Sequence, residues 1–421
     1  MKGHKLGEQP GRRRLPLSFY KAGILALVDC RRTEHSVSSS TTVKNGMIRV
    51  NAITFLNNFV SGALTLLIPL LLLAQNVNLA EIGLVLSVLP LVFLAARLLL
   101  AAVADQIGWS HIFLLVNWPA TLVSTAIYYV AASLPVFLAG KVGEGLREAS
   151  YWAVTRTAIF HLSPKREARE ATKNNGIIWL ATAIGSAIAG LGIASLGFSS
   201  TTIILILASA AISVPAALLW KAEKKSSKQE TQSVLRRLDP RGKGSSFWWI
   251  SIAVMFNSLA TYPLITLLLP VFMDQQMDYS YATIGLLFML YNVTASATAF
   301  LTLKAQLSLR RAVIQSVIAV LASIFLASSG LFFPALLFAL AFVRGFSIAF
   351  FENIVAKATL NSRNVSVDIG LLHVPMRLAE FSSLLAAGFV VQAMGYAPVF
   401  AATGFFFVIF SFISLHQLNT Q

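Results

Sequence analysis

Four charged residues stand within two helical turns of an otherwise apolar stretch, residues 139–164. At about 100° per residue, Lys141, Glu144 and Glu148 share one face of a helix, and Arg147 lies about 60° to its side. In the middle of a bilayer each charge costs roughly 2.5–3.5 kcal/mol, so the four together would cost about 10 kcal/mol against lipid. We therefore predict that this helix turns its charges towards protein or a water-filled cavity.

Two later apolar stretches add charge at a similar depth. Arg344 stands alone in one, and His373, Arg377 and Glu380 share a helix face in the other, where Pro375 should bend the helix and free backbone groups. The central set therefore holds four bases and three acids: Lys141, Arg147, Arg344, Arg377, Glu144, Glu148 and Glu380. If most of them pair, one positive charge remains, which favours an anionic or zwitterionic substrate.

These charges could carry protons as well as bind a solute. A proton-coupled carrier needs a carboxylate whose proton affinity depends on its surroundings, and the three glutamates of the central set are the candidates. The alternative is that the charges are structural ion pairs that fix helix packing. Buried pairs stabilise poorly, and intramembrane charges commonly mark a pathway, which favours the first interpretation.

Polar and aromatic residues nearby offer further contacts to a solute. These candidates are Asn57, Tyr151, Trp152 and Tyr262. The alternative for the aromatic residues is simple packing between helices.

The elements that position these residues are membrane-spanning helices. Of the 421 residues, 56% are hydrophobic and only 12% are charged, against about 25% charged in a soluble protein. Apolar segments long enough to cross a bilayer are expected near 50–74, 81–103, 111–132, 134–159, 173–194, 199–220, 247–273, 281–303, 312–329, 331–357, 368–393 and 397–416. The fold class is therefore an all-α membrane protein with twelve transmembrane helices.

The chain has 33 basic residues and a net charge of +16, and all of the basic residues except Arg97, Lys141, Arg147, Arg344 and Arg377 lie in alternate connections. Ten precede or open the first helix, and eight lie between Lys221 and Lys243. This is the positive-inside pattern, so we expect both termini in the cytoplasm and no binding to nucleic acid.

The sequence lacks the usual motifs of disulfide-bonded, metal-binding and enzymatic proteins. Cys30 is the single cysteine, which excludes an intramolecular disulfide and a cysteine metal cluster. No phosphate-binding Gly-rich loop, metalloprotease motif or nucleophile elbow occurs, and the six histidines lack metal-ligand spacing. We expect no enzyme activity, no cofactor and no metal.

The second half of the chain repeats the first at an offset near 200 residues. Gly83, Gly145 and Gly190 match Gly285, Gly345 and Gly388, the last pair after small shifts in length. The repeat predicts two pseudo-symmetric six-helix bundles. The expected domains are a basic N-terminal extension (1–46), the first bundle (47–220), a cytoplasmic central loop (221–246) and the second bundle (247–421).

Twelve helices, a basic central loop and a half-length repeat resemble the major facilitator superfamily over about residues 47–416. The family's loop motif after the second helix is present in part: Asp105 and Gly108 match, but Ala101, Gln106, Trp109 and Ser110 replace its other residues. Gly143-Glu144-Gly145 and the terminal Leu162-Ser163-Pro164 are closer to the family's pattern in the fourth helix.

The resemblance implies a secondary transporter that works by alternating access, with its cavity lined by the first, fourth, seventh and tenth helices. It also assigns Asp105 and Gly108 to a cytoplasmic gate. We expect a monomer in the cell membrane that moves a small polar or anionic organic solute, driven most simply by protons. The rivals are an efflux pump for amphipathic compounds and, from another class, a non-transporting membrane sensor with a transporter fold.

Overall fold

The structure is a computed structural model. It describes residues 40–163, 167–222, 243–302, 308–328, 330–359 and 365–419. In this part of the chain the regular elements are all helices, and residues 41–421 form one compact unit.

The first half of the chain forms six spans. They are built from α2 (Ser40–Ala74), α3 (Leu79–Ile107), α4 (Trp109–Ile112) with the π-helix η1 (Phe113–Asn117) and α5 (Trp118–Tyr129), α6 (Leu134–Leu162), α7 (Glu167–Ala211) and α8 (Ser213–Ala222). The long helix α7 is broken at Gly197, which has φ +82° and ψ 172°. A positive φ is readily adopted only by glycine, so this residue separates two successive spans.

The second half forms six more. They are built from α10 (Ser245–Pro263) with the π-helix η4 (Leu264–Leu268) and α11 (Leu269–Gln275), α12 (Tyr281–Thr302), α13 (Leu309–Leu326), η5 (Gly330–Phe332) with α14 (Phe333–Thr359), α15 (Val365–Leu372) with α16 (Val374–Met394), and α17 (Tyr396–Asn419).

Ten stretches of the described residues are long and apolar enough to cross a membrane. One of them, Arg169–Ala222, contains the break at Gly197 and counts as two spans. The twelfth span is α6, which is 29 residues long and therefore long enough to cross a bilayer. It is not among the ten because its charged residues lower its hydropathy. The predicted twelve-helix fold is confirmed.

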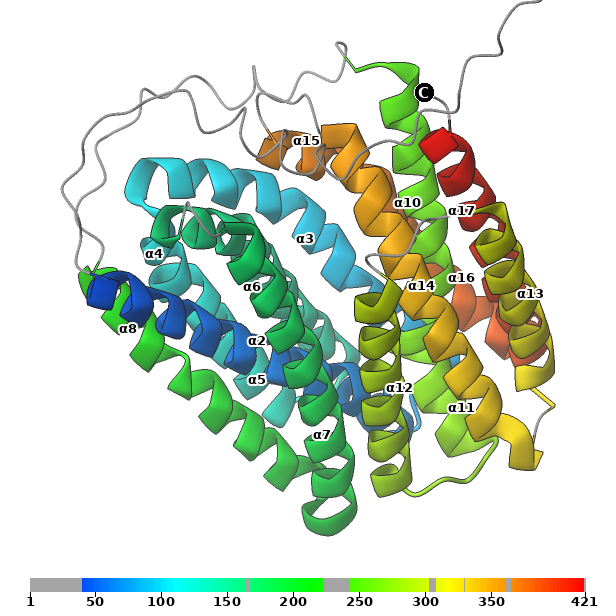
Figure 1. Ribbon diagram of the computed structural model, residues 1–421. Coiled ribbons are helices and arrows are strands. Elements are labelled where there is room, and N and C mark those ends of the chain that lie inside the picture. The colour runs from blue at the N-terminus through cyan, green and yellow to red at the C-terminus, as the bar shows by residue number, and fades with distance from the viewer. Residues whose placement is uncertain are drawn as a thin grey trace, which may run out of the picture. The chain divides into compact units, whose positions relative to one another are not determined.

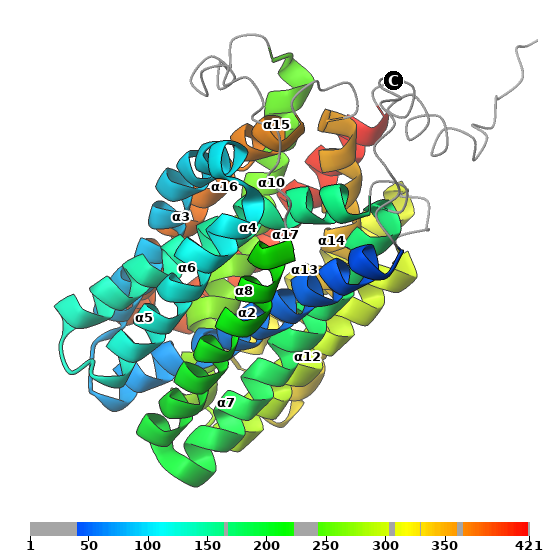
Figure 2. The same cartoon turned by 90° about the vertical axis from the view of Figure 1, so that its left-hand side faces the viewer.

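Two helix pairs join the halves: α7 with α12, and α3 with α16 (Figures 1 and 2). Glycines make both approaches possible. A Cβ on Gly190 would lie 2.6 Å from the Cα of Gly285, and a Cβ on Gly388 would lie 2.4 Å from the Leu79 carbonyl oxygen and 3.2 Å from the Cα of Gly83. These four glycines form two of the three pairs matched in the sequence repeat, so part of the repeat corresponds to the contacts between the halves.

Apolar packing joins the halves at one end of the molecule. A large buried cluster there contains Leu67 and Ile82 from the first half and Leu268 and Ile284 from the second. At the other end, where the basic connections are predicted, each half has its own core. The buried residues of one cluster come from α2, α3, α4, η1, α6 and α8 and from Ile212 between α7 and α8. Those of the other come from α10, α13, α14, α15, α16 and α17.

Candidate functional site

The first part of α6 carries a buried ion pair. Lys141 Nζ donates a hydrogen bond to Glu144 Oε2 at 2.7 Å, and the Tyr128 hydroxyl of α5 donates to the same oxygen at 2.8 Å. Each of the two charged residues is only 2% exposed. The pair is therefore enclosed between α5 and α6, in agreement with the prediction that these charges face protein.

One turn further along, α6 turns its charges towards α2. Arg147 is fully buried; it donates to the Asn57 carbonyl oxygen at 3.0 Å and to Glu148 Oε1 at 2.8 Å. Glu148 also accepts from Ser61 Oγ at 2.9 Å and from Trp152 Nε1 at 3.0 Å. The Glu148 side chain is 15% exposed, so this carboxylate is both paired and open on one side.

Two of the predicted solute contacts lie inside the first bundle. Asn57 accepts through its side chain from Asn117 Nδ2 at 3.2 Å, and the Tyr151 hydroxyl donates to Thr54 Oγ1 at 3.2 Å. Both residues are fully buried. In this conformation they hold helices together and present no surface to a solute, whereas Trp152 is 39% exposed.

The second half carries a matching acid–base pair on α16. Arg377 donates to Glu380 Oε2 at 2.6 Å, and Ser258 of α10 donates to the other carboxylate oxygen at 2.6 Å. The Arg377 guanidinium also lies 3.8 Å from the ring centre of Phe93, on α3 of the other half. This pair therefore sits at the junction of the two bundles.

Arg344 of α14 is the one central charge without a carboxylate partner among the described residues. Its polar contact is the Asn292 side-chain oxygen of α12 at 3.3 Å. The guanidinium lies 5.0 Å from the ring of Trp179, on α7 of the first half, and 5.5 Å from that of Tyr291. Three acids pair with three bases elsewhere in the set, so the leftover positive charge expected from the sequence is Arg344.

Tyr262 of α10 lies between these groups. Its phenol interacts electrostatically with Glu380 of its own half and with Glu144 and Glu148 of the other. The π-helix η4 begins two residues later, at Leu264. Such irregular turns commonly occur at functional sites.

The predicted break in the eleventh span is present. His373 separates α15 from α16, and Pro375 stands in the first turn of α16. A proline has no N–H to donate, so a carbonyl in the preceding turn lacks its usual partner. Ser251 of α10 donates to the nearby Leu372 carbonyl oxygen at 2.7 Å, which ties this break to the seventh span.

The two residues assigned to a gate lie at the end of α3. Gly108 follows the helix with φ +99° and donates its backbone N–H to the Ala104 carbonyl oxygen at 2.9 Å. A tight turn therefore follows α3 at this glycine. Asp105 belongs to α3, but its side chain lies outside the described part of the structure.

The sequence analysis missed several groups that complete the site. Ser61 and Trp179 contact Glu148 and Arg344, and neither type of residue is distinctive in an apolar helix. Arg97 could have been predicted as a site residue because it is a base within an apolar segment. It was not chosen because the family resemblance does not assign α3 to the cavity. In the described part of the chain, no group of three or more His, Cys, Asp or Glu side chains is arranged to hold a metal ion.

Comparison with protein families gives one match. The model of the Major Facilitator Superfamily matches residues 50–364, which is most of the chain. A search of curated protein sequences finds no match.

Solved structures with the same fold include several transporters. The human organic anion transporter MFSD10 shares 16% identity, with 88% of this chain and 99% of that chain covered and a TM-score of 0.65. A bacterial homologue of the human lysosomal transporter Spinster, in an inward-facing and occupied conformation, shares 16% identity over 91% of this chain and 98% of its own, with a TM-score of 0.66. The nucleoside transporter NupG shares 13% over 90% and 100%, with a TM-score of 0.68.

Proposed function

The chain belongs to the Major Facilitator Superfamily, and we propose that it is a proton-coupled secondary transporter of a small organic anion. As a family member with apolar spanning helices it is an integral membrane transporter. The substrate class, the coupling ion, the cell membrane as its location, the cytoplasmic termini and the monomeric state are parts of the proposal.

Arg344 is the observation that carries the substrate class. Arg344 is partly buried, and an arginine withdrawn from water without a carboxylate is costly unless a ligand supplies the negative charge. Its guanidinium can bind a carboxylate or phosphate through two parallel hydrogen bonds. Trp179 and Tyr291 flank the charge with aromatic faces, which suits the apolar body of an organic anion. One fold relative, MFSD10, is described as an organic anion transporter.

The state proposed for this conformation is inward-facing. The halves share an apolar core at the end that the charge pattern assigns to the outside, and they pack separately at the other end. Rocking of residues 47–220 against residues 247–421, joined by the loop 221–246, would then expose Arg344 to each side in turn. Residues 1–39 of the predicted extension and residues 223–242 of the predicted loop lie outside the described part of the structure. Gly108 and Asp105 would belong to the cytoplasmic gate.

Proton coupling is assigned to the carboxylates of the central set. Glu148 and Glu380 each accept hydrogen bonds from a hydroxyl and from an arginine. A carboxylate held in this way can take up a proton in place of its contact with the arginine when water reaches it. Glu144 is enclosed with Lys141 and Tyr128, so it is the third candidate and has the least access to water.

The test is transport by the purified protein in sealed proteoliposomes, with an imposed proton gradient and a panel of labelled organic anions and nucleosides. We expect the protein to accumulate an anion. Accumulation should fall at least tenfold in Arg344→Gln and should be partly retained in Arg344→Lys. The direction of gradient-driven movement separates uptake from efflux. If an uncharged amphipathic compound is transported equally well by the parent and by Arg344→Gln, the efflux alternative is favoured. If no compound is transported, the sensor alternative is favoured.

A further inference from the structure

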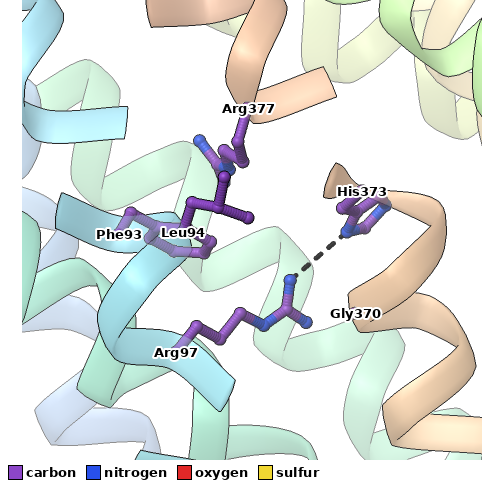
Figure 3. Close-up of a pocket in the computed structure, with 6 residues that line it drawn as sticks. All are labelled: Phe93, Leu94, Arg97, Gly370, His373 and Arg377. Carbon is purple, nitrogen blue, oxygen red and sulfur yellow. Dashed lines mark hydrogen bonds between the residues drawn. The ribbon is translucent and has the colours of Figure 1, made fainter. Parts of the chain in front are cut away.

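A small pocket lies between α3 and α16, away from Arg344. The pocket is narrow, and it is lined by Phe93, Leu94, Arg97, Gly370, His373 and Arg377 (Figure 3). One side of the pocket belongs to the first half of the chain and the other to the second. The pocket also lies beside the helix break at His373.

Positive charge in this pocket is not fully compensated. Within the described residues Arg97 has no carboxylate within 4 Å, and its polar contact is His373 Nδ1, at 3.3 Å. Arg377 pairs with Glu380 through its NH1 group, but its buried Nε has no hydrogen-bond partner in the described part of the chain, and the same is true of His373 Nε2. Arg377 Nε, His373 Nε2 and the Arg97 guanidinium can therefore donate hydrogen bonds to an acceptor placed in the pocket.

Phe93 allows the two arginines to approach. The Arg97 guanidinium lies 5.5 Å from the centre of its ring, and that of Arg377 lies 3.8 Å away. The face of an aromatic ring attracts both cations, which offsets part of their mutual repulsion. The ring thus holds two arginines from opposite halves around one space.

We propose that this pocket binds an anionic group, a carboxylate or a phosphate, as a site separate from Arg344. The planar guanidinium of Arg97 supplies a pair of donors, and the free Nε of Arg377 supplies another. An anion held there contacts α3 and α16 together and so stabilises the contact between the two halves. The group belongs either to a free anion or to the headgroup of an anionic lipid.

Binding to the full chain tests the site without relying on transport. The background is Arg344→Gln, which removes the other proposed anion contact, in an uncharged detergent. Inorganic phosphate and benzoate are titrated by calorimetry against this protein and against the same protein with Arg97→Gln. The matched control is Arg310→Gln, which removes an exposed arginine at the start of α13.

A second arm distinguishes the lipid source. The same variants are placed in nanodiscs of phosphatidylcholine with or without phosphatidylglycerol, and retained lipid is counted by native mass spectrometry. We expect at least one arm to show binding that Arg97→Gln weakens tenfold or more and Arg310→Gln leaves unchanged. If the first arm responds the ligand is a free anion, and if only the second responds it is a lipid headgroup.

Anion binding that is equal with and without Arg97, or no anion binding in either arm, would overturn the proposal. Should Arg97→Gln not fold, Arg97→Lys keeps the charge but loses the planar fork, and at least a threefold weakening is then required. Because these are binding measurements in the Arg344→Gln background, their failure leaves the transport proposal standing, and failure of transport leaves this site standing.

Discussion

Helices α6 and α14 occupy equivalent places in the two halves, yet they treat charge in opposite ways. Glu144 and Arg344 are separated by 200 residues and match in the repeat. Glu144 is enclosed with Lys141 in its own bundle. Arg344 has no carboxylate partner among the described residues and contacts Trp179 of the other bundle. The Glu144 charge of α6 therefore interacts within its own half, whereas the Arg344 charge of α14 contacts a residue of the opposite half.

The backbone packing of the two helices is nevertheless alike. A Cβ on Gly145 would lie 2.7 Å from Val92 Cβ of α3, and a Cβ on Gly345 would lie 2.5 Å from the Ala295 carbonyl oxygen of α12. The same small residue brings each helix against the second helix of its own half. The comparison therefore shows that the repeat preserves helix packing at these positions, whereas the charges of Glu144 and Arg344 have diverged.

The largest expected effect breaks the enclosed pair of α6. Glu144→Gln leaves Lys141 as a buried charge without a carboxylate, and loss of one partner of a buried pair typically costs about 3–5 kcal/mol. Replacing both, with Lys141→Met and Glu144→Gln, should recover most of that loss because no lysine charge is left buried and the Tyr128 hydroxyl can still bond to the amide. Unfolding of the purified variants in detergent, arranged as a double-mutant cycle, measures the recovery.

The matched cycle pairs Glu144→Gln with Arg344→Gln. The repeat places these two residues at equivalent positions, which would allow opposite charges to meet between the halves. In this structure Glu144 contacts Lys141, Arg147 and Tyr128. We expect their coupling to stay within about 0.5 kcal/mol, the range of ordinary additivity. A larger coupling with Arg344 than with Lys141 would reverse our assignment.

The fold was more predictable than the site because the two depend on different information. Length and hydropathy fix spanning helices wherever the bilayer is the solvent, and all six glycines matched in the repeat lie at close contacts between helices. Partners across helices depend on rotation and depth, which a single sequence does not specify. Pairs three residues apart, such as Arg377 with Glu380, were therefore accessible from spacing, but the contact of Arg344 with Trp179 was not.

Equal packing in the two halves can be tested with equal substitutions. Gly145→Ala and Gly345→Ala each place a methyl group against a neighbouring helix, and overpacking of this kind typically costs about 1–3 kcal/mol. We expect the two losses in unfolding free energy to agree within about 1 kcal/mol. Gly176→Ala in α7 is the control, because a Cβ there would meet only Phe300 at an ordinary 3.7 Å. A loss confined to one half would show that the packing has diverged along with the charges.

The paired carboxylates of the two halves provide the third test. Glu148→Gln and Glu380→Gln keep the size of each side chain and remove its proton cycle. Gradient-driven accumulation in proteoliposomes should fall at least tenfold in one of them, while exchange of labelled for unlabelled solute persists. If Glu380→Gln alone is uncoupled, the second half carries both substrate and proton and the contrast between the halves sharpens. If both variants accumulate solute as the parent does, coupling does not pass through these residues.

The smallest expected effect concerns the contact that distinguishes Arg344 from its counterpart. The guanidinium lies 5.0 Å from the Trp179 ring, and a cation over an aromatic face is stabilised by about 0.5–2 kcal/mol, most strongly over tryptophan. Trp179→Phe should therefore weaken the apparent affinity for the anion by a few-fold, and Trp179→Leu should weaken it further. Trp249→Leu, at an exposed tryptophan of α10, is the matched control and should leave the affinity unchanged. The graded order matters more than the size of either step, because a purely steric role for Trp179 would make leucine and phenylalanine equally damaging. Equal effects of leucine and phenylalanine would mean that the Trp179 ring does not stabilise the Arg344 charge. The charges of α14 and α6 would then both interact only within their own bundles.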